Sequence, residues 1–219
     1  MTNNKPSQWD AKQIYVFAGP NGSGKSTIVD RFRQSGMCPL DFICPDQLVP
    51  HDKKNDKNAY IKAMQVAELT RINQVVLGNS FSFETVLSRE EKLKFIKDAR
   101  EASNYDITVI YVVTSDFNIN LKRIAERVQQ GGHDVPPDKV ISRYKKSMDL
   151  MFDVIMSANK AMVFDNSSDK PKTIFEKTNI NIDNEEKYIC YDCSPLIDVY
   201  IKEKARVHGI TISDLSSLY

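Results

Sequence analysis

The sequence has almost no excess of either charge, because 30 Lys and Arg stand against 29 Asp and Glu and leave a formal net charge of +1. So weak a field favours neither nucleic acid nor a membrane surface as a partner, so any anionic ligand must be held by a local group of residues. No apolar run is long enough to cross a bilayer, and residues 1–12 form a polar lead without the hydrophobic core of a signal peptide. We therefore expect a cytoplasmic protein.

The sequence is also poor in cysteine. Four cysteines do not make a disulfide framework in a chain of 219 residues, and a reducing compartment would keep them as thiols. Cys190 and Cys193 form one CxxC, but Cys38 and Cys44 lack the short spacing that a zinc site requires. We interpret the cysteines as small buried thiols, with a metal or redox role for the CxxC as the less favoured alternative.

One stretch, GPNGSGKST, matches the P-loop pattern. It follows the apolar run 14–18 and precedes a segment that can be helical, which is the setting such a loop requires. Its glycines let successive backbone N–H groups point at phosphate oxygens, and the following helix adds the positive end of its dipole. The residues expected to bind the phosphates of ATP are Gly19, Pro20, Asn21, Gly22, Ser23, Gly24, Lys25, Ser26 and Thr27.

Two side chains of this loop have separate expected roles. Lys25 should reach the β- and γ-phosphates, and we expect its ammonium group to be exposed when the loop is empty. The Ser26 hydroxyl can hold a metal ion, so the sequence predicts Mg²⁺ together with ATP. A chance glycine-rich turn is the alternative, but chance rarely supplies strand, loop, Lys-Ser and helix in one register.

Hydrophobic patterns predict strands that alternate with helices. The run ITVIYVV at 107–113 is β-branched and apolar, which is typical of a central strand in a parallel sheet. Further strands are expected at 13–18, 41–44, 80–84 and 161–164, and helices at 25–34, 59–77, 89–102, from Asp116 to Gly131 and from Asp138 onwards. Asp116 can cap the helix that follows it, and Ser88 and Glu91 have capping-box spacing for the helix at 89–102. The alternation predicts an α/β fold, a P-loop NTPase- or kinase-like, doubly wound and mostly parallel sheet with helices on both faces and a short lid.

One main domain is expected, because 219 residues suffice for a single α/β core. It should cover residues 13–170, with the lid around 128–140. Residues 171–219 are expected to form a C-terminal extension packed on the same domain. Two strand candidates at 173–177 and 187–192, a hairpin turn near Asp183 and Asn184, and a helix at about 195–207 make up this extension.

Two carboxylates follow predicted strands and should open onto the same crevice as the P-loop, because ligands of an open α/β sheet bind at the carboxyl ends of its strands. Asp46 is the first candidate for the base that accepts the proton of an attacking hydroxyl, with a helix cap or turn residue as the alternative. Glu84 is a candidate substrate-binding residue, and the alternative is a surface Glu on an edge strand.

The segment from Arg127 to Arg143 has the composition of a lid. It combines a cationic helix end, two glycines, two prolines and a second cationic helix. Lids of this kind exclude water and bring arginines onto a transferring phosphate, so both arginines are candidate catalytic residues. Ordinary solvated arginines are the alternative.

These motifs together resemble the zeta toxin family, in its compact branch of small P-loop ATPases and kinases. The resemblance rests on GPNGSGKST, Pro45-Asp46, the Phe-rich segment that ends in Glu84-Thr85, the run RVQQGGHDVPPDKVISRY and FDNS at 164–167. It implies a kinase that transfers the γ-phosphate of ATP to UDP-N-acetylglucosamine, and an antitoxin partner. It also implies nucleotide-phosphate and Mg²⁺ roles for Lys25 and Ser26, and the base role for Asp46. Glu84, with Thr85, becomes the sugar-contacting part of the site, and Arg127 and Arg143 become a phosphate-clamping pair.

Other functions suit parts of the same pattern. A kinase of another metabolite or antibiotic hydroxyl would use the same loop, base and lid. A nucleotide-dependent ATPase or switch of the ABC type also carries GPNGSGKST, but this chain has no LSGGQ-like signature and no apolar strand that ends in Asp-Glu. A binding module or degenerate toxin without turnover is the last alternative, and the intact Lys25, Ser26 and Asp46 do not favour it.

Overall fold

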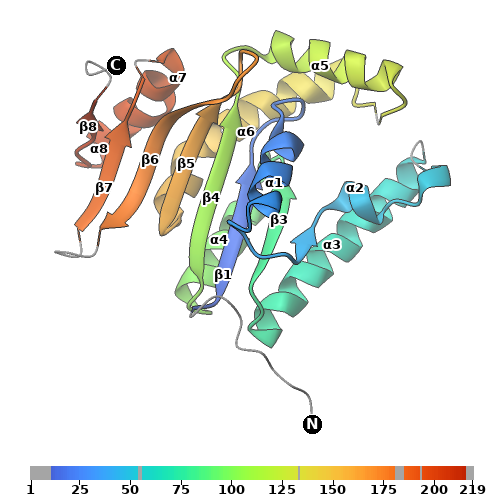
Figure 1. Cartoon of the computed structure of the whole chain (residues 1–219), viewed down its shortest axis with the longest axis horizontal. Helices are drawn as coiled ribbons and strands as arrows, with labels where there is room; N and C mark the ends of the chain where they lie inside the picture. The colour runs from blue at the N-terminus through green and yellow to red at the C-terminus, as the bar shows by residue number, and fades with distance from the viewer. Residues whose placement is uncertain (1–10, 54–55, 133, 181–184, 193, 216–219) are drawn as a thin grey trace.

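The structure is a computed structural model that describes residues 11–53, 56–132, 134–180, 185–192 and 194–215 (Figure 1). Within these ranges eight strands form one sheet: β1 (Gln13–Ala18), β2 (Phe42–Ile43), β3 (Phe81–Thr85), β4 (Asp106–Val113), β5 (Lys160–Asp165), β6 (Lys172–Ile180), β7 (Glu185–Cys190) and β8 (Ser213–Asp214). Their order across the sheet is β2-β3-β1-β4-β5-β6-β7-β8. Strand β6 is antiparallel to both neighbours and the other pairs are parallel, which confirms the predicted mostly parallel α/β fold.

Helices cover both faces of the sheet. The longer ones are α1 (Lys25–Gln34), α3 (Lys57–Leu77), α4 (Glu90–Glu101), α5 (Phe117–Gln129) and α6 (Pro137–Ser157). The short ones are α2 (Pro45–Leu48), the 3₁₀ turn η1 (His51–Lys53), and the C-terminal run of α7 (Pro195–Ile197), the π-helical η2 (Asp198–Lys202) and α8 (Glu203–Val207). Figure 1 shows α1 in front of the sheet and α4 and α6 behind it.

The two faces have separate cores because strand side chains alternate between them. On one face, Ile28 and Phe32 of α1 pack on Phe17 of β1 and on Val112 of β4. On the other face, α3, α4, α6 and the C-terminal helices bury a larger cluster that includes Phe83 of β3. The apolar runs of β1 and β4 therefore belong to central strands that are covered on both sides, as the sequence predicts.

The starts of two helices test the capping predictions differently. Asp116 is the N-cap of α5, and its carboxylate accepts a hydrogen bond of 2.9 Å from the Asn118 N–H, as expected. The capping box of Ser88 and Glu91 is wrong. Helix α4 begins one residue later, with Arg89 as an N-cap that makes no side-chain capping bond. Leu87 just before it has φ +50°, and this turn displaces the helix start.

The C-terminal extension continues the sheet. Strands β6 and β7 pair antiparallel, as a hairpin would, although the predicted turn at Asp183 and Asn184 lies outside the described residues. A helical run covers 195–207 as expected, and β8 adds a short parallel strand that the sequence did not indicate.

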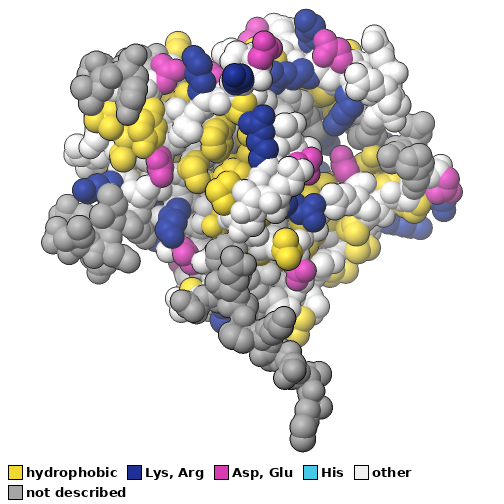
Figure 2. Space-filling model, viewed as in Figure 1, with side chains coloured by type: hydrophobic (Ala, Val, Ile, Leu, Met, Phe, Trp, Pro, Cys, Tyr) yellow, Lys and Arg dark blue, Asp and Glu magenta, His cyan; other side chains and the backbone are white. Residues whose placement is uncertain are grey.

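Figure 2 shows one face of the molecule, on which Lys and Arg side chains are interspersed with Asp and Glu. No helix in the described ranges is long and apolar enough to cross a membrane.

A buried lysine of the C-terminal extension makes hydrogen bonds to the end of helix α6. Lys177 on β6 is 1% exposed, and its Nζ donates to the carbonyls of Met156 (3.1 Å) and Ala158 (2.7 Å) at the end of α6. The same ammonium lies 3.0 Å from Glu186 Oε1 on β7. Carbonyls at a helix C-terminus carry partial negative charge and lack partners within the helix. A buried ammonium there gives these carbonyls hydrogen bonds and at the same time finds acceptors for its own N–H groups.

We therefore expect Lys177→Met to lower the free energy of unfolding by about 2 kcal/mol, because it leaves two helix-terminal carbonyls and a carboxylate without their partner. Urea denaturation followed by circular dichroism measures this. Lys160→Met is the matched control, since Lys160 is an exposed strand lysine 3.9 Å from Asp106, and its loss should cost less than about 0.5 kcal/mol. Equal effects of the two substitutions would contradict the fastening role.

Candidate active site

The P-loop backbone packs directly against neighbouring elements. Gly19 has φ +138°, and a Cβ there would lie 2.1 Å from the carbonyl oxygen of Val112 at the end of β4. Gly24 has φ +91°, and a Cβ there would lie 2.2 Å from Asn166 Nδ2. Any larger side chain would push the loop away from both neighbours, so these two glycines are structurally required.

Two asparagines hold the loop by its carbonyl groups. Asn120 Nδ2 donates to the Asn21 carbonyl at 2.6 Å, and Asn166 Nδ2 donates to the Ser23 carbonyl at 2.8 Å. Asn120 is fully buried, and its own carbonyl oxygen accepts a hydrogen bond from the Thr114 hydroxyl. These bonds fix the directions of the Asn21 and Ser23 carbonyls.

Several polar groups of the loop are available to a ligand. The Ser23 hydroxyl is buried and makes no hydrogen bond with any described residue. Helix α1 begins at Lys25, so its first N–H groups lack partners within the helix. Buried donors are normally paired, and phosphate oxygens are suitable acceptors at a helix start. The residues of the loop therefore fit the phosphates of a nucleotide.

Lys25 is not exposed as expected, since only 4% of its surface is accessible. Its Nζ donates to the Pro20 carbonyl at 2.8 Å and lies 3.8 Å from Glu84 Oε1. Burial lowers the pKa of Lys25, and the charges of Glu84 and Asp46 oppose that change while Arg127 adds to it. The sequence-based expectation failed because the loop pattern does not show which carboxylate lies beneath the lysine.

Glu84 belongs to an interior strand. Strand β3 lies between β2 and β1, with Glu84 opposite Phe17, so the edge-strand alternative is wrong. Adjacent residues of β3 face opposite sides of the sheet, so Phe83 enters the core on the α4 side while Glu84 faces α1. The Ser26 hydroxyl donates to Glu84 Oε2 at 3.3 Å. One carboxylate thus contacts both Lys25 and Ser26.

The pair of Ser26 and Glu84 has the chemistry of a partial Mg²⁺ site. In the described part of the chain, no group of three or more His, Cys, Asp or Glu side chains could hold a metal ion. Mg²⁺ commonly takes one or two protein ligands and completes its shell with phosphate oxygens and water. The donors therefore fit Mg²⁺ that arrives with a nucleotide.

Asp46 lies on the accessible side of this group. It is exposed in the first turn of α2, where Cys44 and not Asp46 is the N-cap residue. Its charge acts on Lys25 and on Tyr60 of α3, and the charge of Arg127 acts on the same two groups. Burial, together with Asp46, raises the pKa of Tyr60. The charges of Asp46 and Arg127 therefore act on both Lys25 and Tyr60, and no sequence pattern pointed to Tyr60.

The other two predicted site residues have different surroundings. Burial and the charge of Arg89 lower the pKa of Arg143, whereas the charge of Arg127 acts on Lys25 and Tyr60. The Thr85 hydroxyl accepts a hydrogen bond of 3.0 Å from the Leu87 N–H and so shapes the turn after β3. Their roles in substrate binding remain predictions.

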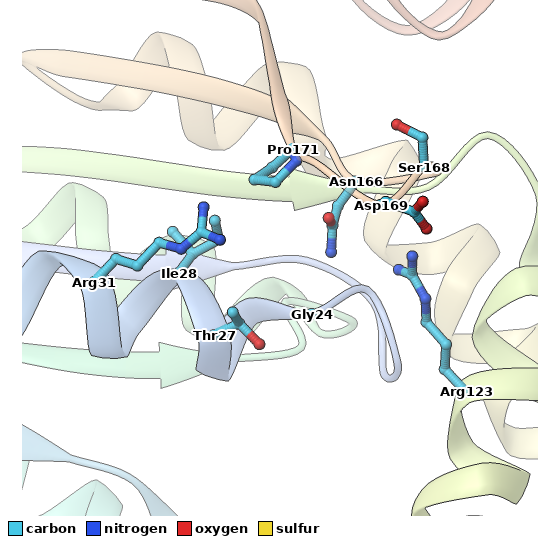
Figure 3. Close-up of a pocket in the computed structure, with 9 residues that line it drawn as sticks. All are labelled: Gly24, Thr27, Ile28, Arg31, Arg123, Asn166, Ser168, Asp169 and Pro171. Atoms are coloured by element: carbon cyan, nitrogen blue, oxygen red, sulfur yellow. The ribbon is translucent and has the colours of Figure 1, made fainter.

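A pocket of about 270 Å³ adjoins the P-loop (Figure 3). Arg123 enters it from α5, and its guanidinium and the Asp169 carboxylate point toward one another. Arg123 Nη1 is buried and makes no hydrogen bond with any described residue. The sequence analysis did not assign this pocket, which is lined by Gly24, Thr27, Ile28, Arg31, Arg123, Asn166, Ser168, Asp169 and Pro171.

Comparisons with known proteins bear on the fold. No protein-family model matches the chain. An uncharacterized protein of Haemophilus influenzae is 31% identical over 131 residues, which cover 58% of this chain and 89% of that protein. The solved complex AvrRxo1-ORF1:-ORF2 with ATP has a TM-score of 0.60 at 14% identity, and the match covers 77% of this chain but only 59% of that one. A chain of the PezAT chromosomal toxin–antitoxin system of Streptococcus pneumoniae has a TM-score of 0.54 at 13% identity, with 80% and 75% covered. These likenesses confirm the fold that the resemblance implies.

The hydrogen bond from Asn120 to the Asn21 carbonyl can be tested by substitution. Asn120→Asp keeps the size of the side chain but replaces the amide donor with a carboxylate facing the Asn21 carbonyl. It should lower the free energy of unfolding by about 2 kcal/mol and weaken ADP binding about tenfold or more. Asn73→Asp, at an exposed position of α3, is the control and should change either quantity little. Thermal unfolding measures the stability, and calorimetric titration with ADP measures the affinity. An unchanged ADP affinity in Asn120→Asp would show that ADP binding does not depend on the hydrogen bond from Asn120 to the loop.

Proposed function

This chain belongs to the same family as the uncharacterized protein of Haemophilus influenzae, and we propose that it transfers the γ-phosphate of ATP to a hydroxyl group of a small molecule. The observation that carries the proposal is the group around Lys25. The buried ammonium of Lys25 lies 3.8 Å from Glu84, which also accepts a hydrogen bond from Ser26. The accessible carboxylate of Asp46 acts on the same ammonium through its charge. Phosphoryl transfer needs this combination of charge neutralisation and a proton acceptor.

Each residue then has a definite task. The backbone N–H groups of residues 19–26, except Pro20, which has none, and the ammonium of Lys25 bind the phosphates. Asp46 accepts the proton of the acceptor hydroxyl, and Arg127 stabilises charge on the transferring phosphate. Ser26 and Glu84 would hold Mg²⁺, which when bound neutralises phosphate charge. This use of Glu84 differs from the sugar contact that the resemblance implies, and the bond to Ser26 supports it.

The pocket in Figure 3 suits the nucleoside part of ATP. It adjoins the loop at Gly24 and Thr27, so a nucleotide with its phosphates in the loop would extend its ribose and base into this space. Arg123 can lie against a base with its guanidinium plane, and its unpaired Nη1 can donate to a ring or ribose oxygen.

The acceptor proposed first is a nucleotide sugar such as UDP-N-acetylglucosamine, by resemblance to zeta toxins. The hydroxyl of another metabolite or of an antibiotic is the alternative. An ABC-like switch is less favoured, because the chain has no LSGGQ-like signature and no apolar strand that ends in Asp-Glu. A protein antitoxin is a proposed partner, supported by the AvrRxo1 and PezAT structures, whose names describe a complex and a toxin–antitoxin system. We also propose a cytoplasmic location.

The base role of Asp46 is tested by Asp46→Asn. The amide keeps the size of the side chain but cannot accept a proton, so transfer to an acceptor should fall by about 10²-fold or more while ATP affinity changes little. Release of ADP with UDP-N-acetylglucosamine and a panel of sugars and alcohols measures the rate, and calorimetry measures ATP binding. Asp41→Asn, at an exposed carboxylate just before β2, is the matched control.

Two results would overturn the kinase proposal. One is full transfer activity in Asp46→Asn. The other is ATP hydrolysis by the wild-type protein that no acceptor in the panel accelerates, which would favour the switch.

The role of Glu84 is tested by Glu84→Gln. If Glu84 holds Mg²⁺ with Ser26, the Mg²⁺ concentration for half-maximal activity should rise about 10- to 100-fold, with the acceptor KM little changed at saturating Mg²⁺. If Glu84 instead contacts a sugar, the acceptor KM should rise at every Mg²⁺ concentration. Titrations of both quantities on one preparation separate the two assignments.

A further inference from the structure

Helix α3 carries an exposed apolar surface. Apolar residues scattered singly over a protein surface are ordinary, whereas a continuous apolar patch marks an interaction site. Leu69 is 66% exposed and Val76 is 77% exposed. In the described part of the chain, seven of the exposed large hydrophobic side chains lie on this one helix: Ile61, Met64, Val66, Leu69, Ile72, Val76 and Leu77.

The side of α3 that faces the sheet is built from other residues. The buried residues of the helix are Ala63, Ala67 and Arg71, which follow one another at intervals of four and therefore form one stripe. At about 100° per residue, Leu69 points away from this stripe. Most of the larger aliphatic side chains of α3 therefore point outward, which is the reverse of the arrangement in an ordinary surface helix.

The outward face of α3 has almost no charge. Within residues 63–78 the charged side chains are Glu68 and Arg71. Arg71 is buried, and Glu68 lies 3.0 Å from Lys92 of α4 on one flank of the helix. Water normally faces a charged side of a surface helix, and a helix that is apolar all round is normally covered all round. We therefore expect a second molecule on this face.

The apolar pattern reads alike in both directions from Leu69. Val66 and Ile72 lie three residues before and after it, and Ile61 and Leu77 lie eight residues before and after it. When two copies of a helix pack antiparallel about a twofold axis, residues at equal distances on either side of the axis meet. With the axis at Leu69, Ile72 of one copy would face Val66 of the other. The face therefore matches a second copy of itself.

The charged residue nearest to this pattern does not oppose the pairing. Lys62 lies seven residues before Leu69 and Val76 lies seven residues after it, so each lysine would lie beside the valine of the other copy. The two Lys62 residues would be about 20 Å apart along the helix pair, so they would repel little. The aliphatic stem of a lysine can also cover an apolar neighbour.

The area of the face is sufficient for a weak dimer. Each of its six aliphatic side chains can bury on the order of 100 Å², so two copies together would bury about 1,200 Å², which is the lower limit for specific interfaces. These side chains are 46–77% exposed and comprise Ile61, Val66, Leu69, Ile72, Val76 and Leu77.

We propose that the outward face of α3 is a dimer interface, and that its occupant is α3 of a second copy, packed antiparallel about an axis at Leu69. Figure 1 shows α3 at the β2 end of the sheet, far from β7 and β8. The inference is independent of the proposed function, because none of the six side chains belongs to the P-loop or to the group around Lys25.

Sedimentation equilibrium of the full chain tests the interface. Wild-type protein should form dimers with a Kd in the micromolar range, and Leu69→Lys should weaken association about 100-fold or more, because it places two ammonium groups at the axis. Leu69 is exposed, so the variant should fold, and circular dichroism checks this. Val207→Lys is the matched control, since Val207 on α8 is 75% exposed and lies at the other end of the sheet. It should associate as wild type does.

A pair of opposite charges tests the register. Val66→Lys and Ile72→Glu should each form homodimers about tenfold more weakly than wild type, because each substitution places a charge against an apolar side chain of the other copy. Mixed in equal amounts, the two variants should form a heterodimer that is tighter than either homodimer. In that heterodimer the introduced ammonium group faces the introduced carboxylate.

Three results would overturn the proposal. Wild-type protein that stays monomeric at about 100 μM would exclude a second copy as the occupant and leave the face to a different protein. Dimers that Leu69→Lys does not weaken would place the interface elsewhere. A mixture of Val66→Lys and Ile72→Glu that associates no more tightly than the separate variants would exclude the antiparallel register about Leu69.

Discussion

The shape of the P-loop depends on contacts that its backbone makes with neighbouring strands and side chains. A Cβ at Gly19 would nearly coincide with the Val112 carbonyl, and Asn120 and Asn166 hold the loop by two of its own carbonyls. These asparagines are 99 and 143 residues from their partners in the chain. Only the side-by-side order β1-β4-β5 brings the ends of those strands to the loop. The topology of the sheet therefore determines the shape of the P-loop.

Charge balance beneath the loop follows from the same topology. A buried ammonium such as that of Lys25 is stable only when carbonyl oxygens and a carboxylate replace the lost water. Strand β3 supplies the carboxylate, because its pairing with β1 places Glu84 opposite Phe17, just before the loop begins. Since Ser26 is bonded to the same carboxylate, one side chain controls both the charge environment of Lys25 and the orientation of the Ser26 hydroxyl.

Local patterns predicted the elements well where local physics decides them. The β-branched run at 107–113 and the P-loop helix from Lys25 agree with β4 and α1 almost to the residue. Asp116 was identified as a cap because its side chain reaches an N–H two residues away. Ser88 was misassigned because the turn at Leu87 fixes where α4 begins, and side-chain spacing alone does not encode that turn.

The site was less predictable, because its residues meet only after folding. Motif spacing identified Lys25, Ser26, Asp46 and Glu84, but it did not reveal that Lys25 is buried or that β3 is interior. Tyr60 and Arg123 had no local signal, since ordinary helices contain such residues. Their surroundings come from α3 and α5 meeting the carboxyl edge of the sheet.

A signal that does exist in the sequence is a polar residue on the buried stripe of a helix. Asn120 stands three residues after Phe117 and four before Ile124, on the side of α5 that faces the protein, and Arg71 continues the four-residue spacing of Ala63 and Ala67 on α3. Burying either group without an acceptor or donor would cost more than a single surface contact contributes. Asn120 finds its partners in the P-loop and in Thr114. Arg71 lies over the ring of Phe83, and the nearby Glu68 carboxylate, which also pairs with Lys92, favours its charged form.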